Sequence, residues 1–180
     1  ITVIEMAGFE ADDLMGTYAR LAEAAGFAVV LVTGDKDFMQ LVTERTTIWD
    51  PMKDETLDIP GIAQKLALTP SQIVDMMGLA GDSTDNIPGV PGIGPKTAAA
   101  LIRDFGNLEA LYQRLDDVKA PKQRENLASH KEQAFLSRTL ATIDTRVPLD
   151  FNPQELLRRE PDGRVLGEVF QELEFRQLQQ

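Results

Sequence analysis

The chain contains no cysteine and only one histidine, His130, among its 180 residues. The missing thiols exclude disulfide bonds, cysteine nucleophiles and zinc sites built from cysteine and histidine. A serine–histidine mechanism would have a single candidate base. Any chemistry in this chain is therefore expected to rest on carboxylates, hydroxyls, amines or bound cations.

Long apolar runs and a leader segment are also missing. No stretch approaches the ~18 consecutive apolar residues that a membrane helix needs, so we expect no membrane span. No signal peptide is visible, and a chain that starts Ile1-Thr2 without Met is expected to lack its native N-terminus. This cysteine-free composition favours a cytoplasmic protein.

Positive charge is scarce, with 18 Lys and Arg residues against 29 Asp and Glu, a net charge of −11. Such a balance by itself opposes nucleic-acid binding, because phosphate contacts need Lys and Arg. An acidic excess has two interpretations: a solvated surface, or carboxylates gathered around cations. The positions of the acids along the chain decide between them.

The first third of the chain shows an α/β pattern. Strands are predicted at 1–6, 27–34 and 46–50, the second of them buried, and helices at 11–25 and 35–42. This β-α-β-α-β order predicts a parallel sheet with helices on its faces.

The rest of the chain has mainly helical periodicity. Helices are predicted at 60–68, 70–80, 95–104, 107–115, 121–142 and 163–174, with a short strand at 147–151. Thr69 and Pro70 suit the N-cap and first turn of the second of these helices. We therefore expect two domains: a partial α/β core at 1–68, and a helical subdomain at 69–180 whose last helices pack back on the core.

Seven acidic residues occur in three groups. They are Glu10, Asp12 and Asp13 at the start of the first helix, Asp35 and Asp37 after the apolar strand, and Asp82 and Asp85 in a polar loop. Each group has an ordinary structural explanation: helix capping for the first two and an Asx turn for the third.

Taken together, the three groups indicate a metal site. If the helices start at one end of adjacent strands, the acids face the same crevice, and so many carboxylates stay ionised there only when cations neutralise them. Oxygen ligands select Mg²⁺ or Mn²⁺, and pairs of such ions about 4 Å apart catalyse phosphodiester hydrolysis. Setting the seven acids aside leaves 22 acidic residues against 18 basic ones, so the acidity need not oppose nucleic-acid binding.

A glycine-proline segment, VPGIGPKTAAALI at 90–102, follows the polar loop. Gly92 and Gly94 permit a tight hairpin with uncovered N–H groups, and Pro95 suits the first turn of a helix. Lys96 adds a charge to that helix N-terminus, which predicts a grip on one DNA phosphate without base reading. A plain helix-turn-helix connection is the structural alternative, and the spacing does not fit a dinucleotide fingerprint.

Three motifs follow one another along the chain: GFEADD at 8–13, TGDKDFMQLV at 33–42 and GDSTDNIPGVPGIGPKTA at 81–98. In this order and spacing the chain resembles the 5′–3′ exonuclease (5′ nuclease) domains of bacterial DNA polymerase I, within the flap endonuclease superfamily. The resemblance extends over nearly the whole chain, to the final LEF at 173–175.

The resemblance implies a PIN-like α/β core and a nuclease that cleaves DNA phosphodiesters at 5′ flaps or nicks in replication and repair. It implies two Mg²⁺ ions, replaceable by Mn²⁺, with all seven acids as ligands and with Asp35, Asp37, Asp82 and Asp85 catalytic. It also implies a helix-hairpin-helix element in a helix-3-turn-helix subdomain, binding DNA duplex and K⁺. The corresponding positions here are Gly92, Ile93, Gly94, Lys96 and Thr97.

Other features of the family pattern are missing, namely an early strand with an Asp-Gly motif and a basic helical arch. The chain thus resembles the C-terminal portion of such a nuclease, with a sheet that is incomplete at the N-terminus, and we expect the isolated chain to be impaired. The resemblance further implies a monomer, sequence-independent binding, fusion to or action with a DNA polymerase, and a bacterial, nucleoid-associated location.

Two other functions compete with this interpretation. A non-catalytic module could use the hairpin to bind duplex, but it would gain nothing from acids that repel phosphate. A PIN-like ribonuclease shares the acidic α/β architecture, but the hairpin favours duplex DNA over RNA.

Overall fold

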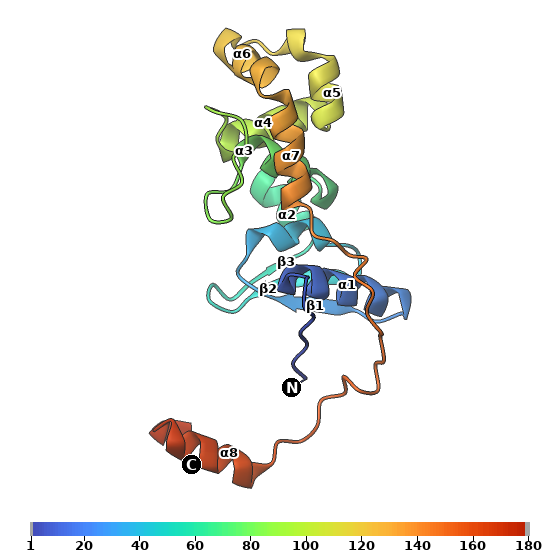
Figure 1. Ribbon diagram of the computed structural model, residues 1–180, viewed down its shortest axis with the longest axis vertical. Coiled ribbons are helices and arrows are strands. Elements are labelled where there is room, and N and C mark those ends of the chain that lie inside the picture. The colour runs from blue at the N-terminus through green and yellow to red at the C-terminus, as the bar shows by residue number, and fades with distance from the viewer. Residues whose placement is uncertain (1, 179–180) are drawn as a thin grey trace. The chain divides into compact units, whose positions relative to one another are not determined.

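A computed structural model describes residues 2–178 (Figure 1). The chain forms two compact units: a large one, Glu5–Phe151, and a small one that joins Asn152–Gln180 to the residues up to Ile4. The large unit contains the sheet and most of the helices, and therefore all the site residues predicted from the sequence.

A three-stranded sheet lies at one end of the large unit. Strands β1 (Val29–Val32), β2 (Thr46–Asp50) and β3 (Glu55–Leu57) follow one another in that order. β1 and β2 pair in parallel, as the sequence predicts, whereas β3 pairs antiparallel to β2. The chain reverses at once through the turn at 51–54, which leaves no room for a crossover helix.

One face of β1 is covered. Helix α1 (Ala11–Ala24) packs against β1, the 3₁₀ helix η1 (Lys36–Leu41) packs against α1 and β2, and Leu31 is only 5% exposed. Val30 and Val32 on the opposite face are 58% and 54% exposed. The prediction of a buried strand therefore holds for one face only among the described residues, because burial on both faces needs helices on both sides of a sheet.

Four other sequence predictions differ from the structure. Residues 2–6 and 147–151 form no strand. Instead, the backbone N–H of Val147 donates to Thr17 Oγ1 at 3.1 Å, so this segment is bonded to helix α1 rather than to a strand. The helix expected at 35–42 is the short 3₁₀ helix η1. The helix expected at 121–142 breaks at His130.

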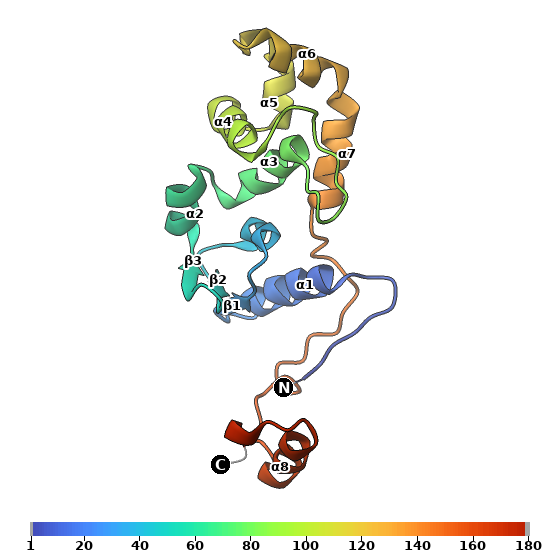
Figure 2. The ribbon, with the colours of Figure 1, turned by 90° about the vertical axis from the view of Figure 1, so that its left-hand side faces the viewer.

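The helical part of the large unit stacks beyond the sheet (Figures 1 and 2). Its α-helices are α2 (Ile59–Leu66), α3 (Ile73–Ala80), α4 (Pro95–Phe105), α5 (Leu108–Gln113), α6 (Pro121–Ser129) and α7 (Lys131–Ala141), with 3₁₀ turns at Pro70–Gln72 and Leu115–Asp117. Side chains such as Ile102, Leu108 and Leu127 are fully buried at their centre. As predicted, Thr69 is the N-cap and Pro70 the first residue of the 3₁₀ turn that leads into α3, and the N–H of Thr69 donates to Gln72 Oε1 at 2.9 Å.

Helices α3 and α7 pack closely, and one arginine joins them to a third helix. Gly78 makes the approach possible, since a β-carbon there would lie 2.8 Å from Cβ of Arg138. The Arg138 guanidinium binds Asp75 of α3 at 2.9 Å and Glu109 of α5 at 2.8 Å. Because Asp75 is only 6% exposed, this pairing balances a charge that water cannot reach freely.

The small unit contains helix α8 (Gly163–Glu172) and a 3₁₀ turn at Arg176–Leu178. Asp162 caps α8 by accepting from the N–H groups of Arg164 and Val165, and the rings of Phe170 and Phe175 lie 6.3 Å apart. Within residues 2–178, every helix is too short or too polar to cross a membrane.

Candidate metal centre and nucleic-acid interface

Asp35 and Asp37 lie where β1 ends. The Asp35 carboxylate accepts the backbone N–H of Asp37 at 3.0 Å and so starts η1, while the N–H of Asp35 donates to Thr33 Oγ1. The tight 3₁₀ turn directs Asp37 inward, where it is 8% exposed and its Oδ1 atom has no hydrogen-bond partner. A buried carboxylate oxygen without a donor is suited to bind a cation, since such atoms are costly unless a proton or cation meets them.

The loop that carries Asp82 and Asp85 is closed by its own backbone. The N–H and C=O groups of Asp82 and Ile87 bond reciprocally, at 2.9 and 2.7 Å. At the neck of this loop Gly81 and Gly89 both have positive φ and face each other so closely that a β-carbon on either would overlap backbone atoms. These two glycines therefore fix the position of both aspartates.

The two segments bring Asp37, Asp82 and Asp85 together. One carboxylate oxygen from each lies within 4.8 Å of the others. Asp37 and Asp82 are buried and Asp85 is exposed, so the group opens to solvent on the Asp85 side.

The remaining predicted ligands line the same place. A cavity of about 310 Å³ is bordered by six of the seven acids and by apolar residues of α7 and the segment after it. The six are Glu10, Asp12, Asp13, Asp35, Asp37 and Asp85. One of them already has a structural partner, because Asp13 Oδ1 accepts the N–H of Asp144 at 2.8 Å.

The crowding of these acids changes their protonation. Burial, followed by the charges of Asp35 and Asp82, raises the pKa of Asp37 to about 7. The pKa of Asp12 is also raised, by burial first and by Asp35 next. Both shifts mean that the pocket resists further negative charge unless a cation enters it.

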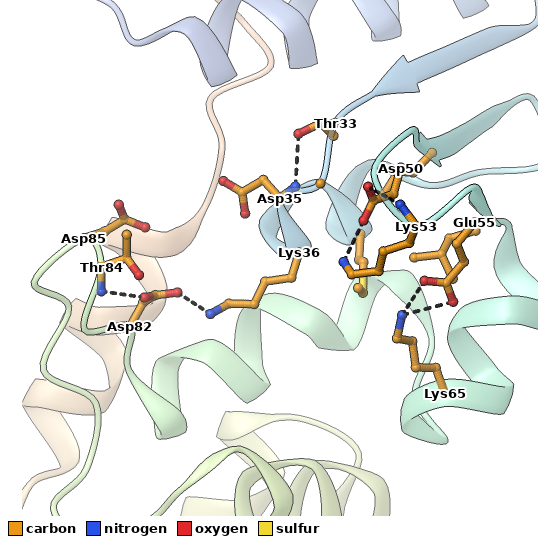
Figure 3. Close-up of a pocket in the computed structure, with 14 residues that line it drawn as sticks. Thr33, Asp35, Lys36, Asp50, Lys53, Glu55, Lys65, Asp82, Thr84 and Asp85 are labelled. Atoms are coloured by element: carbon orange, nitrogen blue, oxygen red, sulfur yellow. Dashed lines mark hydrogen bonds and ion pairs between the residues drawn. The ribbon is translucent and has the colours of Figure 1, made fainter.

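Lys36 supplies one positive charge to this region. Its Nζ lies 2.6 Å from Oδ2 of Asp82, and the backbone N–H of Thr84 donates to Oδ1 of the same carboxylate at 2.8 Å (Figure 3). These bonds hold the pKa of Asp82 below its ordinary value. Lys36 was not among the predicted site residues, although its place between Asp35 and Asp37 in TGDKD was a visible signal.

The donor set fits a hard divalent cation. The set consists only of carboxylate oxygens, and one of them is buried without a hydrogen-bond partner. The three oxygens lie close together, and the Asp85 side of the group is open to water. Mg²⁺ and Mn²⁺ prefer such oxygen ligands and keep several waters.

A second, larger cavity of about 570 Å³ lies on the other side of Asp35 and Lys36 (Figure 3). Lys53 reaches Asp50 at 2.6 Å and Lys65 reaches Glu55 at 2.8 Å along its wall. These pairs were not predicted from the sequence, because each has one member, Lys53 or Glu55, in the turn at 51–54 or in β3, neither of which was expected.

The glycine-proline hairpin leads directly into α4. Gly94 is the N-cap, Pro95 is the first residue of the helix, and Gly92 has φ +78°. Open space surrounds the position of a β-carbon on Gly94, and Lys96 is exposed. Asn126 of α6 donates to the carbonyl of Pro91 at 2.8 Å and holds the hairpin from behind.

Two of the predicted DNA-binding residues are less accessible. The Ile93 side chain is 2% exposed and belongs to the core, so only its backbone can reach a ligand. Thr97 is half-buried. The accessible groups are thus the backbone of Gly92–Gly94 and the side chain of Lys96.

Family models cover most of the chain. Residues 1–68 match the 5′-3′ exonuclease N-terminal resolvase-like domain, and residues 68–164 match the 5′-3′ exonuclease C-terminal SAM fold. DNA polymerase I of Streptococcus pneumoniae is 43% identical over 98% of this chain and 20% of its own length. The flap endonuclease Xni of Cronobacter sakazakii is 48% identical over 83% of this chain and 59% of its own length. The chain spans about a fifth of the polymerase relative.

Solved structures have a similar fold. The bacteriophage T5 5′-exonuclease with bound divalent metal ions is 26% identical, with a TM-score of 0.69 over 79% of this chain and 53% of that one. The T5 D15 flap endonuclease in a complex with DNA and metal ions is 25% identical, with a TM-score of 0.68 over 79% and 52%. The matched models, the shared fold and the carboxylate pocket agree: this chain belongs to the 5′-3′ exonuclease family.

Proposed function

We propose that this chain is part of a metal-dependent, structure-specific 5′ nuclease that hydrolyses DNA phosphodiesters at 5′ flaps or nicks. The observation that carries the proposal is the convergence of Asp37, Asp82 and Asp85, whose oxygens lie within 4.8 Å of one another beside the carboxylate-lined cavity. Such a pocket repels the phosphate of DNA when it is empty, so its use on DNA requires cations.

Two Mg²⁺ ions, replaceable by Mn²⁺, would supply an activated water and stabilise the leaving oxygen. The chain contributes the ligands and their placement. Asp37 offers its unpartnered buried oxygen, Asp85 faces solvent, and Asp82 is held in register by Thr84 and by the closed loop. Lys36 balances one of these charges until the cations are in place.

The hairpin would hold the duplex beside this pocket. Backbone N–H groups at a helix N-terminus and the cation of Lys96 grip phosphate without contacting bases, so binding is sequence-independent. K⁺ at the hairpin, held by backbone carbonyls, would add a positive charge there. Pro95 lies only ten positions after Asp85, which limits the distance between the gripped duplex and the cleaved bond.

The relatives support this proposal. The T5 enzyme is described in complex with DNA and metal ions, and Xni is named a flap endonuclease. A chain of this kind acts as a monomer on its substrate, alone or joined to a DNA polymerase.

The experiment is cleavage by the complete gene product of three substrates: 5′-flap DNA, fully paired DNA and single-stranded RNA. We expect Mg²⁺-dependent cleavage of flap DNA near the junction, abolished by EDTA and restored by Mn²⁺. Preferred cleavage of RNA would favour a ribonuclease, and tight duplex binding without cleavage would favour a non-catalytic module.

A further inference from the structure

The proposed metal ligands come from three parts of the large unit that are far apart in the sequence. Asp13 lies in α1, Asp37 in η1, and Asp82 in the loop after α3. A site of this kind works only when its ligands are held to within about 0.5 Å of their working positions. The contacts that join these three parts therefore decide whether the carboxylates converge.

Helix α7 and the segment that follows it run from the helical part of the unit towards α1 (Figure 2). In α7, Gln133 donates to the carbonyl of Gly89 at 2.6 Å, and Oγ of Ser137 accepts the N–H of the same glycine at 3.0 Å. Because Gly89 closes the neck of the aspartate loop, these bonds fasten that loop to α7. After the helix, the N–H of Asp144 donates to the Asp13 carboxylate at 2.8 Å.

The side chain of Gln40 makes the third connection. Its Nε2 donates to two backbone carbonyls, that of Asp37 at 3.0 Å and that of Ala141 at 2.9 Å. Its Oε1 accepts the N–H of Ile143 at 3.0 Å. Both hydrogens of the carboxamide and its oxygen are thus engaged, and they join η1 to residues 101 and 103 positions away in the sequence.

The packing around this connection is tight. A β-carbon on Gly16 of α1 would lie 2.8 Å from Ile143 and 3.3 Å from Leu41, so α1, η1 and the segment after α7 lie in close contact. Ala141 is buried. The backbone groups that Gln40 serves therefore have little room to reach other partners, and their loss would shift η1.

We propose that Gln40 is a positioning residue of the metal centre. It holds η1 against the end of α7 and so sets the place of the Asp37 carboxylate relative to the aspartate loop, which is bonded to the same helix. Gln40 acts through the backbone of Asp37. Partners that orient ligands in this way typically change metal affinity or activity by about 10–100-fold when they are removed. This inference rests on the proposed function, because it concerns the same metal centre.

The first test measures occupancy of the centre without DNA cleavage. Fe²⁺ takes the place of Mg²⁺, and with ascorbate and peroxide it cuts the protein backbone beside its ligands. In the complete gene product, the Fe²⁺ concentration that gives half-maximal cutting at 35–37 and 82–85 reports this centre alone. Gln40→Met keeps the length of the side chain and removes its hydrogen bonds, so we expect this concentration to rise about 10–100-fold.

Gln72→Met is the matched control. Gln72 is also half-buried, donates to the carbonyl of Gly106 at 2.9 Å and accepts the N–H of Thr69 at 2.9 Å, outside the carboxylate-lined cavity. Its loss should leave the half-saturating Fe²⁺ concentration within about twofold of the wild-type value. Gln40→Asn keeps the amide but is one methylene shorter; it should shift the concentration in the same direction by a smaller factor, and it replaces Gln40→Met if that variant does not fold.

Cleavage of flap DNA gives a second readout. Gln40→Met should need about 10–100-fold more Mg²⁺ for its half-maximal rate, while the KM for flap DNA at saturating Mg²⁺ and the duplex affinity in EDTA stay at wild-type values. Wild-type metal dependence in a folded Gln40 variant, or an equal shift in Gln72→Met, would overturn the role of Gln40 alone. Absence of Fe²⁺-directed cutting at these aspartates in the wild type would overturn the proposed metal centre itself.

Discussion

The Nζ atom of Lys36 lies 2.6 Å from Oδ2 of Asp82, between the metal centre and two further cavities. The side chain of Lys36 is 59% exposed, whereas the side chain of Asp82 is 4% exposed. This lysine is therefore the chain's own counter-ion for a buried carboxylate that a divalent cation would otherwise neutralise.

Lys36→Met should destabilise the metal-free chain by about 1–2 kcal/mol, because Asp82 would lose its cationic partner and keep only the hydrogen bonds from Thr84. Saturating Mg²⁺ should remove most of this loss. Urea unfolding with EDTA and with Mg²⁺ measures both effects. Lys53→Met is a matched control, since Lys53 binds buried Asp50 at the same 2.6 Å outside the carboxylate cluster. An equal response of both variants to Mg²⁺ would refute this role of Lys36.

Asp37→Asn should stabilise the metal-free chain at pH 8 while weakening cation binding. The pKa of Asp37 is about 7 in the folded chain, and it lies near 4 in an unfolded chain. Ionisation therefore costs folding free energy, and the metal-free chain loses stability as the pH rises from about 4 to 7.

The expected gain at pH 8 in EDTA is about 1–3 kcal/mol, and it should vanish below about pH 4. Thermal unfolding across this pH range provides the measurement. Exposed Asp104→Asn should change stability by less than about 0.5 kcal/mol at any pH. If the stability of Asp37→Asn varied with pH as the wild type's does, Asp37 would not be the carboxyl with the raised pKa.

Gly89→Ala and Gly94→Ala should differ sharply. At Gly89 a β-carbon meets the backbone of Gly81 at positive φ, so we expect a loss of about 3 kcal/mol or more and displacement of Asp82 and Asp85. At Gly94 a β-carbon meets open space with ordinary φ, so stability should hardly change while duplex affinity falls. Urea unfolding and fluorescence anisotropy separate the two effects, and a large stability loss in Gly94→Ala would contradict the free-hairpin geometry.

Arg138→Ala should destabilise the helical part by about 2–3 kcal/mol, because it leaves buried Asp75 without its charged partner. Burial raises the pKa of Asp75 even beside Arg138, which shows how costly that charge is. The double variant Arg138→Ala with Asp75→Asn should recover part of the loss. Additive losses in chemical denaturation would mean that the two residues do not interact.

The local signals that predicted the fold were strong ones. Thr69-Pro70 and Gly94-Pro95 mark helix starts with side-chain and φ preferences that act within a few residues, and both helices begin there. The strand predictions were wrong at 2–6 and at 147–151, because alternation alone does not provide a pairing strand. Val147 finds its backbone partner in Thr17, 130 residues away in sequence.

The acidic residues of the candidate site could be predicted from their types and from their positions along the sequence. Acids after a strand and in a glycine-bounded loop indicated the cluster that Asp37, Asp82 and Asp85 form. The sequence could not separate Asp13 from Glu10 and Asp12, although the Asp13 carboxylate already accepts a hydrogen bond from the backbone of Asp144. The cavity bounded by η1, α2, α3 and α4 could not be predicted from the sequence, since its methionines and lysines come from four separate elements.

The most direct test compares cleavage and binding of 5′-flap DNA by the complete gene product and its Asp82→Asn, Asp85→Asn double variant. The carboxylates are proposed to hold the cations for hydrolysis and not to bind DNA. With saturating Mg²⁺, single-turnover cleavage should therefore fall at least about a hundredfold in the variant. Flap affinity in EDTA should stay equal or rise as repulsion is removed. Cleavage by the variant at the wild-type rate would contradict a metal centre built on this loop.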